Sequence, residues 1–155
     1  EKVAISEAVA VHLEPMHHWS ARGIFDCYEA LWAAFSISAP SGNIYFVGDS
    51  GYGNGDYFRE VKAKFGRFRL AILPIGAYDP RWFMAYGHMA PDECVRAFED
   101  LGRPFVLPIH HSTFPLADTG YGQPLADLHL AMAGQQTAEE RILPLAIGAS
   151  RMVPR

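Results

Sequence analysis

Residues 45–52 read Tyr45-Phe46-Val47-Gly48-Asp49-Ser50-Gly51-Tyr52, an apolar run that ends abruptly in a carboxylate set between two glycines. Such a run is typical of a strand that ends in a loop. Open α/β sheets bind ligands at the carboxyl ends of their strands, so the pattern predicts that Asp49 lies at a ligand-binding edge. The alternative is a plain turn, because Asp and Gly are ordinary turn residues.

Two histidine pairs follow strand-like runs in the same way, His17-His18 and His110-His111. Imidazole and carboxylate donors together suit zinc, iron or manganese. Taken singly, each histidine pair is equally explained as part of a polar loop. Three donor groups at three strand ends nevertheless predict a shared metal site.

Apolar runs alternate with amphipathic segments along the chain. Residues 3–14 are expected to form one strand, or two strands with a bend at Glu7. Further strands are expected over residues 31–38, 44–47, 69–75, 105–109 and 142–147, and helices over 57–65, 91–101 and 124–134, with a further helix start at 137–140. Helices that alternate with apolar strands predict an α/β fold in layers.

The composition fits one globular domain with a core: 155 residues, of which 50% are hydrophobic and only 19% charged. Charge below the usual quarter indicates more apolar surface than a self-contained domain carries. A net charge of −4 gives no basic footprint, so neither nucleic acid nor anionic lipid is an expected partner. No apolar run reaches the ~18 residues of a membrane span. Cys27 and Cys94 follow no redox or metal-finger spacing, so a reducing cytoplasm is the expected location.

A group of large apolar side chains, Trp82-Phe83-Met84, follows the expected strand at 69–75. It is interpreted either as the wall of an apolar substrate groove or as an aromatic cluster that closes the core. His88 lies just beyond it. His88 is a candidate catalytic imidazole, or part of the loop before the next helix.

Four motifs occur in a fixed order along the chain. They are Gly48-Asp49-Ser50-Gly51-Tyr52, Ile75-Gly76-Ala77-Tyr78-Asp79-Pro80-Arg81-Trp82-Phe83-Met84, His88-Met89-Ala90-Pro91-Asp92-Glu93 and Ile109-His110-His111-Ser112-Thr113-Phe114. Together they resemble the C-terminal half of the metallo-β-lactamase superfamily. The resemblance is greatest to the branch that contains N-acyl-phosphatidylethanolamine-hydrolysing phospholipase D and its bacterial relatives. It extends from about His12 to Val153, and residues 78–84 are specific to that branch.

The resemblance implies a metal-binding role for three residues. His18, which precedes Trp19, matches a metal ligand, Asp49 matches the carboxylate that bridges two metals, and His110 matches a ligand of the second metal. Two zinc ions are therefore expected in the complete domain, with manganese or iron as alternatives.

The resemblance also implies catalytic and substrate-binding residues. Asp49 and His88 match catalytic positions, and His88 lies near the substrate. The substrate-binding segment contributes Tyr78, Trp82 and Phe83. Ser112 departs from the glycine often found at its position.

The implied parent fold has four layers, αββα, and residues 1–155 correspond to the C-terminal sheet-and-helix half of that single domain. The family's His-x-His-x-Asp-His signature does not occur in the sequence, and the chain opens at Glu1 directly on an alternating run. We therefore expect a truncated or processed chain whose N-terminal half is absent. Weak or no metal binding, and no activity, are expected of this chain alone.

The implied activity is metal-dependent hydrolysis of a small-molecule or lipid-like substrate, a phosphodiester or phospholipid-like compound, by a metal-activated water. A lactonase or other ester hydrolase is the alternative, because relatives on one scaffold act on different bonds. A third reading is a non-catalytic half-domain that acts through association. Exposed apolar strands predict a homo-oligomer, or association with the missing N-terminal half.

Overall fold

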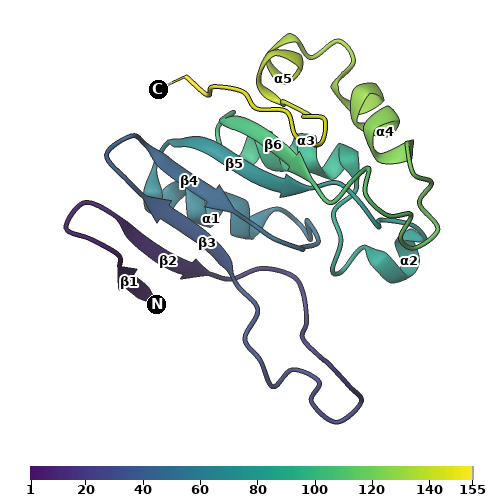
Figure 1. Cartoon of the computed structure of the whole chain (residues 1–155), viewed down its shortest axis with the longest axis horizontal. Helices are drawn as coiled ribbons and strands as arrows, with labels where there is room; N and C mark the ends of the chain where they lie inside the picture. The colour runs from purple at the N-terminus through teal and green to yellow at the C-terminus, as the bar shows by residue number, and fades with distance from the viewer. Residues whose placement is uncertain (155) are drawn as a thin grey trace.

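The computed structural model describes residues 1–154 and folds them around a six-stranded sheet (Figure 1). The strands are β1 (Lys2–Ala4), β2 (Ala10–Glu14), β3 (Ala34–Ser38), β4 (Asn43–Phe46), β5 (Phe68–Pro74) and β6 (Phe105–Ile109). The helices are α1 (Asp56–Phe65), α2 (Arg81–Met84), α3 (Pro91–Asp100), α4 (Gln123–Met132) and α5 (Gln136–Arg141). The predicted α/β class is confirmed.

The order of the strands in the sheet is their order in the chain, β1 to β6. Strands β1 to β4 pair antiparallel, whereas β4, β5 and β6 pair parallel. Parallel neighbours need a crossover, which α1 supplies between β4 and β5, and α2 with α3 between β5 and β6. The carboxyl ends of β4, β5 and β6 therefore meet at one edge of the sheet.

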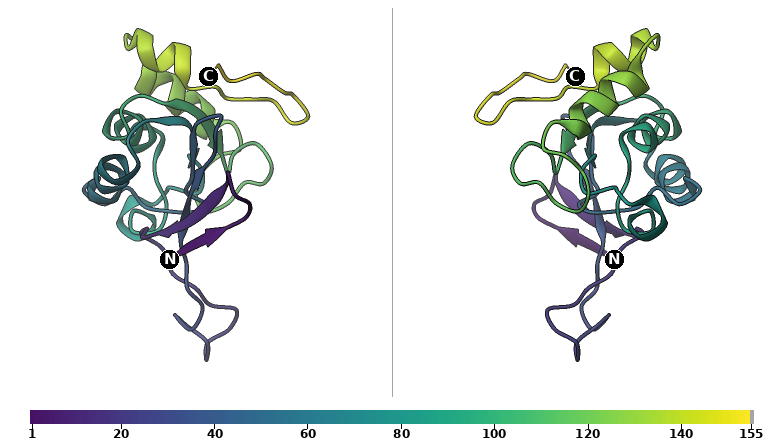
Figure 2. Two further views of the ribbon diagram at one scale, coloured as in Figure 1. Left: turned by 90° about the vertical axis from the view of Figure 1, so that its left-hand side faces the viewer. Right: turned by 90° about the vertical axis from the view of Figure 1, so that its right-hand side faces the viewer.

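Helices α1 and α3 cover one face of the sheet, which we call the covered face (Figure 2). Side chains on this face are buried in a single core, and its largest fully buried members include Tyr45, Phe68, Phe98, Leu73 and Val106. Glu14 is also buried there, and its carboxylate accepts from Lys64 Nζ of α1 at 2.7 Å. A buried carboxylate needs such a partner, so β2 is tied to α1.

The opposite face, which we call the open face, is apolar and has no helix over its centre. Its alternating side chains are Val11, Leu13, Phe35, Ile37, Ile44, Phe46, Leu70, Ile72, Phe105, Leu107 and Ile109, all of intermediate exposure. The strand register places them side by side: Ile37 opposite Ile44, and Phe46 opposite Ile72. One sheet with helices on one face is the expected sheet-and-helix half.

Residues 3–14 form two strands, the β1–β2 hairpin, which agrees with the second of the two readings expected. Two other segments differ from expectation, and in the first of them α2 occupies residues where no helix was expected. Residues 142–147 were expected to form a strand, but there Ile142 makes an isolated bridge to Val106 and the segment then leaves the sheet. Pro144 explains this, because proline cannot donate to a strand ladder. None of the helices described over residues 1–154 is long and apolar enough to cross a membrane.

Candidate metal centre

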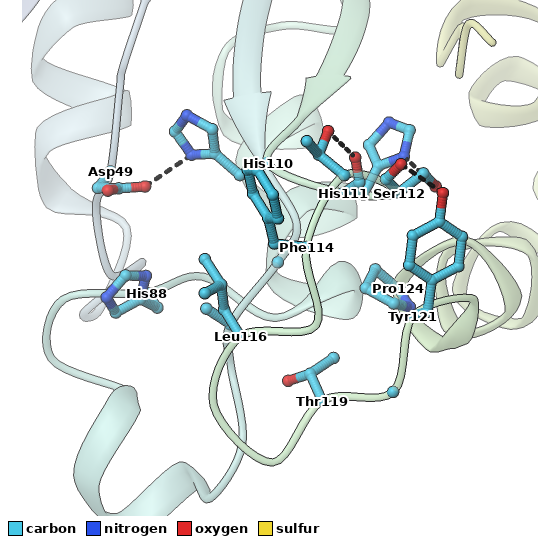
Figure 3. A pocket seen from close by; sticks show the side chains of 14 residues that line it. Asp49, His88, His110, His111, Ser112, Phe114, Leu116, Thr119, Tyr121 and Pro124 are labelled. Atoms are coloured by element: carbon cyan, nitrogen blue, oxygen red, sulfur yellow. Dashed lines mark hydrogen bonds and ion pairs between the residues drawn. The ribbon is translucent and has the colours of Figure 1, made fainter. Parts of the chain in front are cut away.

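Asp49 lies just beyond the carboxyl end of β4, as the sequence predicted. Val47 still bonds to the sheet, since its N–H donates to the carbonyl of Ile72 at 3.1 Å. Gly48 then turns the chain with a left-handed φ of 73°, a conformation that favours glycine. The turn directs the Asp49 side chain out of the sheet edge into a pocket (Figure 3).

His17 holds the segment after Asp49 in place. Its N–H donates to Ser50 Oγ at 3.2 Å, and its carbonyl accepts from the N–H of Gly51 at 3.0 Å. Its ring packs against that of Tyr57, with centroids 4.6 Å apart. The first histidine of this pair is therefore a structural residue, which leaves His18 free to face the carboxylate.

Two imidazoles approach different oxygens of the same carboxylate. His110 Nδ1 lies 2.6 Å from Asp49 Oδ1, and His18 Nε2 lies 3.9 Å from Asp49 Oδ2. His18 comes from the segment after β2 and His110 from the end of β6. The three predicted ligands therefore converge at one edge of the sheet.

His110 reaches this position because the ends of β5 and β6 approach closely. A Cβ at Gly76 would overlap the carbonyl oxygen of His110, so this crossing requires glycine. His110 itself has a left-handed φ of 61°. Non-glycine residues rarely adopt this conformation, and it is concentrated at functional sites.

Electrostatics favour an ionised carboxylate at the centre. The hydrogen bond from His110 lowers the pKa of Asp49 below its ordinary value, whereas partial burial opposes this shift. His88 lies on the other side of the carboxylate, edge-on to the His18 ring with centroids 5.5 Å apart. Burial lowers the pKa of His88, so its imidazole is neutral at neutral pH.

The position of His88 is fixed by a guanidinium. Arg81 Nη1 donates to the carbonyl of His88 at 3.0 Å and to that of Tyr78 at 3.1 Å. Arg81 Nη2 donates to Glu93 at 2.7 Å, and the same Glu93 oxygen accepts from the N–H of Ala90 at the start of α3. The His88 backbone is thus held between α2 and α3.

The donor chemistry suits metal ions, but the ligand sets are incomplete. Each oxygen of Asp49 has one imidazole beside it, as a carboxylate bridging two ions would have. His18 Nδ1 is a buried polar atom that finds no hydrogen-bond partner in the described part of the chain. Within residues 1–154, however, no group of three His, Cys, Asp or Glu side chains is arranged to hold one ion. A catalytic zinc takes about three protein ligands, so these residues alone do not form such a site within residues 1–154.

The pocket beside Asp49 has a volume of about 350 Å³ and is lined by His88 and His110 as well. The structure does not bring the other predicted substrate-binding residues into it. Tyr78 is buried, and its hydroxyl donates to Asp127 of α4. Trp82 and Phe83 of α2 are exposed over 86% and 68% of their surface and line no part of this pocket.

The far wall of the pocket comes from residues 111–121, between β6 and α4, which we call the rim loop. Its lining residues include His111, Phe114, Leu116 and Tyr121. Sequence reasoning singled out none of these four for substrate binding. The loop has no periodicity, and its one available signal was its place directly after the predicted ligand His110.

Known proteins similar to this chain agree on one family. Residues 1–111 match the beta-lactamase superfamily domain. The chain is 42% identical over 108 residues to the outer membrane protein RomA of Klebsiella pneumoniae, covering 70% of this chain and 78% of RomA. It is 34% identical over 121 residues to an N-acyl-phosphatidylethanolamine-hydrolyzing phospholipase D of Caenorhabditis elegans, covering 78% of this chain but only 34% of the length of that relative.

Among solved structures, an isothiocyanate hydrolase from Delia radicum gut bacteria superposes with a TM-score of 0.70 at 13% identity. The superposition covers 96% of this chain and 55% of that protein. At this identity the likeness shows the fold alone, and this chain spans about half the length of that protein. By sequence and by fold, the chain belongs to the metallo-β-lactamase superfamily.

Proposed function

We propose that this chain carries half of the metal centre of a metal-dependent hydrolase. The observation that supports this most directly is the placement of Asp49, whose two carboxylate oxygens each have a different imidazole beside them, His110 and His18. A carboxylate so placed can share its oxygens between two ions. The remaining ligands would come from outside residues 1–154, as expected of the C-terminal part of a larger domain.

Each residue of the site has a distinct task in this proposal. When bound, a pair of divalent ions such as zinc supplies an activated water and stabilises developing negative charge. Asp49, ionised at neutral pH, holds the centre of the ligand set, and His18 and His110 each add one imidazole. Neutral His88, fixed by Arg81, presents a ring nitrogen to the pocket, where it can donate a hydrogen bond to substrate.

The substrate we propose is a phosphodiester with a lipid-like portion. The 34% identical relative from Caenorhabditis elegans is named for hydrolysing N-acyl-phosphatidylethanolamine, and its likeness covers 78% of this chain. The pocket combines Asp49, His88 and His110 at one end with the apolar side chains of Phe114 and Leu116 next to them. An elongated substrate with a polar reacting group and an apolar remainder fits such a pocket.

Zinc titration by calorimetry tests the metal site in this chain. We expect weak binding that Asp49→Asn weakens further by at least about tenfold, since the substitution removes the shared carboxylate. Asp92→Asn is a matched control, because this carboxylate is exposed on α3 and bonds to Arg96. Zinc binding that is as tight in Asp49→Asn as in the unaltered chain would contradict the proposal.

Hydrolysis tests the substrate class. The gene product that carries this chain, loaded with zinc, is expected to cleave alkyl p-nitrophenyl phosphodiesters in preference to lactones or simple p-nitrophenyl esters. Asp49→Asn should abolish this cleavage, whereas Asp92→Asn should retain it. Preference for a lactone would instead favour an ester hydrolase on the same scaffold.

A further inference from the structure

The rim loop places large apolar side chains next to the metal-binding carboxylate. Phe114 and Leu116 are exposed over 72% and 59% of their surface, and both line the pocket that contains Asp49. Figure 3 shows these two side chains in the middle of the pocket, with Asp49 and His88 on one side and Tyr121 on the other. Exposed apolar surface that gathers in a concave site is characteristic of a ligand-binding wall.

Hydrogen bonds hold the rim loop in a defined shape. The N–H of Asp118 donates to the carbonyl of Asp79 at 3.1 Å, and the N–H of Asp79 donates back to Thr119 Oγ1 at 3.3 Å. Thr119 is itself buried. Closer to the ligands, Tyr121 Oη donates to the carbonyl of Ser112 at 2.7 Å. Because the wall is preformed, binding there avoids most of the entropic cost of ordering a loop.

The chemistry of the pocket changes along its length. Asp49, His88 and His110 lie on one side of Phe114 and Leu116, whereas His111 lies on the other side with Tyr121 and Pro124. Neither lysine nor arginine lines it. A charged group is therefore favoured at the carboxylate end, where metal ions would bind, and a hydrocarbon group is favoured at the rim loop.

We propose that the rim loop binds the hydrocarbon chain of the substrate, and that Phe114 and Leu116 determine which chain lengths are accepted. This inference rests on the proposed function, since it assigns the reacting phosphodiester to the Asp49 end of the same pocket. It differs from what the family resemblance implies, which is that Trp82 and Phe83 bind the substrate. Those two side chains lie on α2, outside the pocket.

Binding of alkylphosphonates to this chain, measured by calorimetry and by amide NMR shifts, tests the inference without requiring turnover. Methyl-, butyl- and octylphosphonate share one head group and differ only in hydrocarbon length. Each methylene buried against the rim loop should improve the dissociation constant by up to about fourfold, until the pocket is filled. We expect octylphosphonate to bind at least about tenfold more tightly than methylphosphonate, with the largest shifts in residues 112–121.

Substitutions in the rim loop should remove this preference. Leu116→Asp and Phe114→Ala should bring the dissociation constant of octylphosphonate close to that of methylphosphonate. The control is Leu130→Asp, the same change at an exposed leucine of α4, which should leave the preference for octylphosphonate intact. Leu116→Ala is a conservative second variant if the aspartate disturbs folding. Equal binding of all three phosphonates by the unaltered chain would overturn the inference.

Trp82→Ala decides between the two candidate walls. If this substitution abolishes the chain-length preference and the rim-loop variants do not, the inference is wrong and the segment named by the resemblance forms the wall. If instead the proposed function is wrong, zinc should bind the Asp49→Asn variant as tightly as it binds the unaltered chain. The two proposals can therefore fail separately.

Discussion

The covered and open faces of the sheet are built from the same alternating apolar strands, yet they have different surroundings. On the covered face, α1 and α3 bury side chains such as Leu73 and Phe98 completely. On the open face, neighbours in the same strands, such as Ile72, remain of intermediate exposure. The sequence pattern of a strand therefore specifies which side chains share a face, but not whether that face obtains a partner.

The edge of the sheet at which we propose that metal binds lies next to both faces. Asp49 and His110 leave the ends of β4 and β6, and the covered face holds those strands rigidly in place. The ligand sets remain partial within residues 1–154, on a sheet whose other face has no helix over its centre. The core of the covered face therefore positions Asp49 and His110. The remaining part of the proposed site depends on what packs against the open face.

The largest expected effect is a core truncation on the covered face. Phe98→Ala should lower the free energy of unfolding by about 3–5 kcal/mol, because Phe98 is fully buried between α3 and the sheet. At protein concentrations too low for self-association, Phe46→Ala on the open face should cost only about 1 kcal/mol, since Phe46 already contacts water in the monomer. Guanidinium unfolding of both variants measures the contrast. An equal loss for both would show that the open face is covered in solution.

The two cysteines provide a second contrast, between the covered face and an exposed loop. Burial raises the pKa of the Cys94 thiol to about 12, whereas Cys27 is exposed. Because the thiolate is the nucleophile, iodoacetamide at about pH 8 should alkylate Cys94 roughly a thousandfold more slowly than Cys27. Cys27→Ser should remove the fast reaction, and rapid labelling of both thiols would contradict a closed core.

The same shift predicts how stability depends on pH. The folded state raises the pKa of Cys94 above its ordinary value of 9.0, so the stability that the buried neutral thiol contributes is fully present below about pH 9. That contribution to stability is lost as the pH rises toward 12, because the Cys94 thiol ionises in the unfolded chain but stays neutral in the folded core. Cys94→Ala should weaken this alkaline loss of stability. Unfolding midpoints between about pH 8 and 11 measure the effect.

A third contrast concerns association through the open face. We expect this chain to self-associate by packing two open faces together, since a row of eleven apolar side chains exceeds what a monomer usually exposes. Phe46→Lys should raise the dissociation constant at least about tenfold, because each association buries two lysines. Glu60→Lys, on the exposed side of α1, is the control. Light scattering that shows the unaltered chain as a 17.2 kDa monomer at high concentration would contradict this expectation.

Local patterns in the sequence predicted much of the fold. The β3–β4 hairpin, the positions of α1 and α3, and strands β5 and β6 follow from apolar periodicity and from glycine and proline signals. The convergence of Asp49 with His110 also follows, because strand ends of a parallel sheet meet at one edge. Choosing His18 over His17 required the family resemblance, and the packing of the His17 ring against Tyr57 shows why the two differ.

Other parts could not be predicted because they depend on contacts distant in sequence. Residues 142–147 have the composition of a strand, but only Ile142 finds a position beside β6. Trp82 and Phe83 have the composition of a substrate wall, but α2 turns them outward. The rim loop shows no periodicity, and its shape comes from hydrogen bonds to Asp79, more than thirty residues away.

The smallest expected effect concerns Ser112, which lies near the start of the rim loop, two residues after the predicted ligand His110. Ser112 has a left-handed φ of 57°, which costs a non-glycine residue about 1 kcal/mol. Ser112→Gly should relieve this strain but lose the contact between the Ser112 hydroxyl and His111 Nδ1, 2.9 Å apart. Ser112→Ala loses the same contact and keeps the strain. The glycine variant should therefore be more stable than the alanine variant by about 1 kcal/mol in unfolding experiments, whereas equal stabilities would mean that the rim loop relaxes to another conformation.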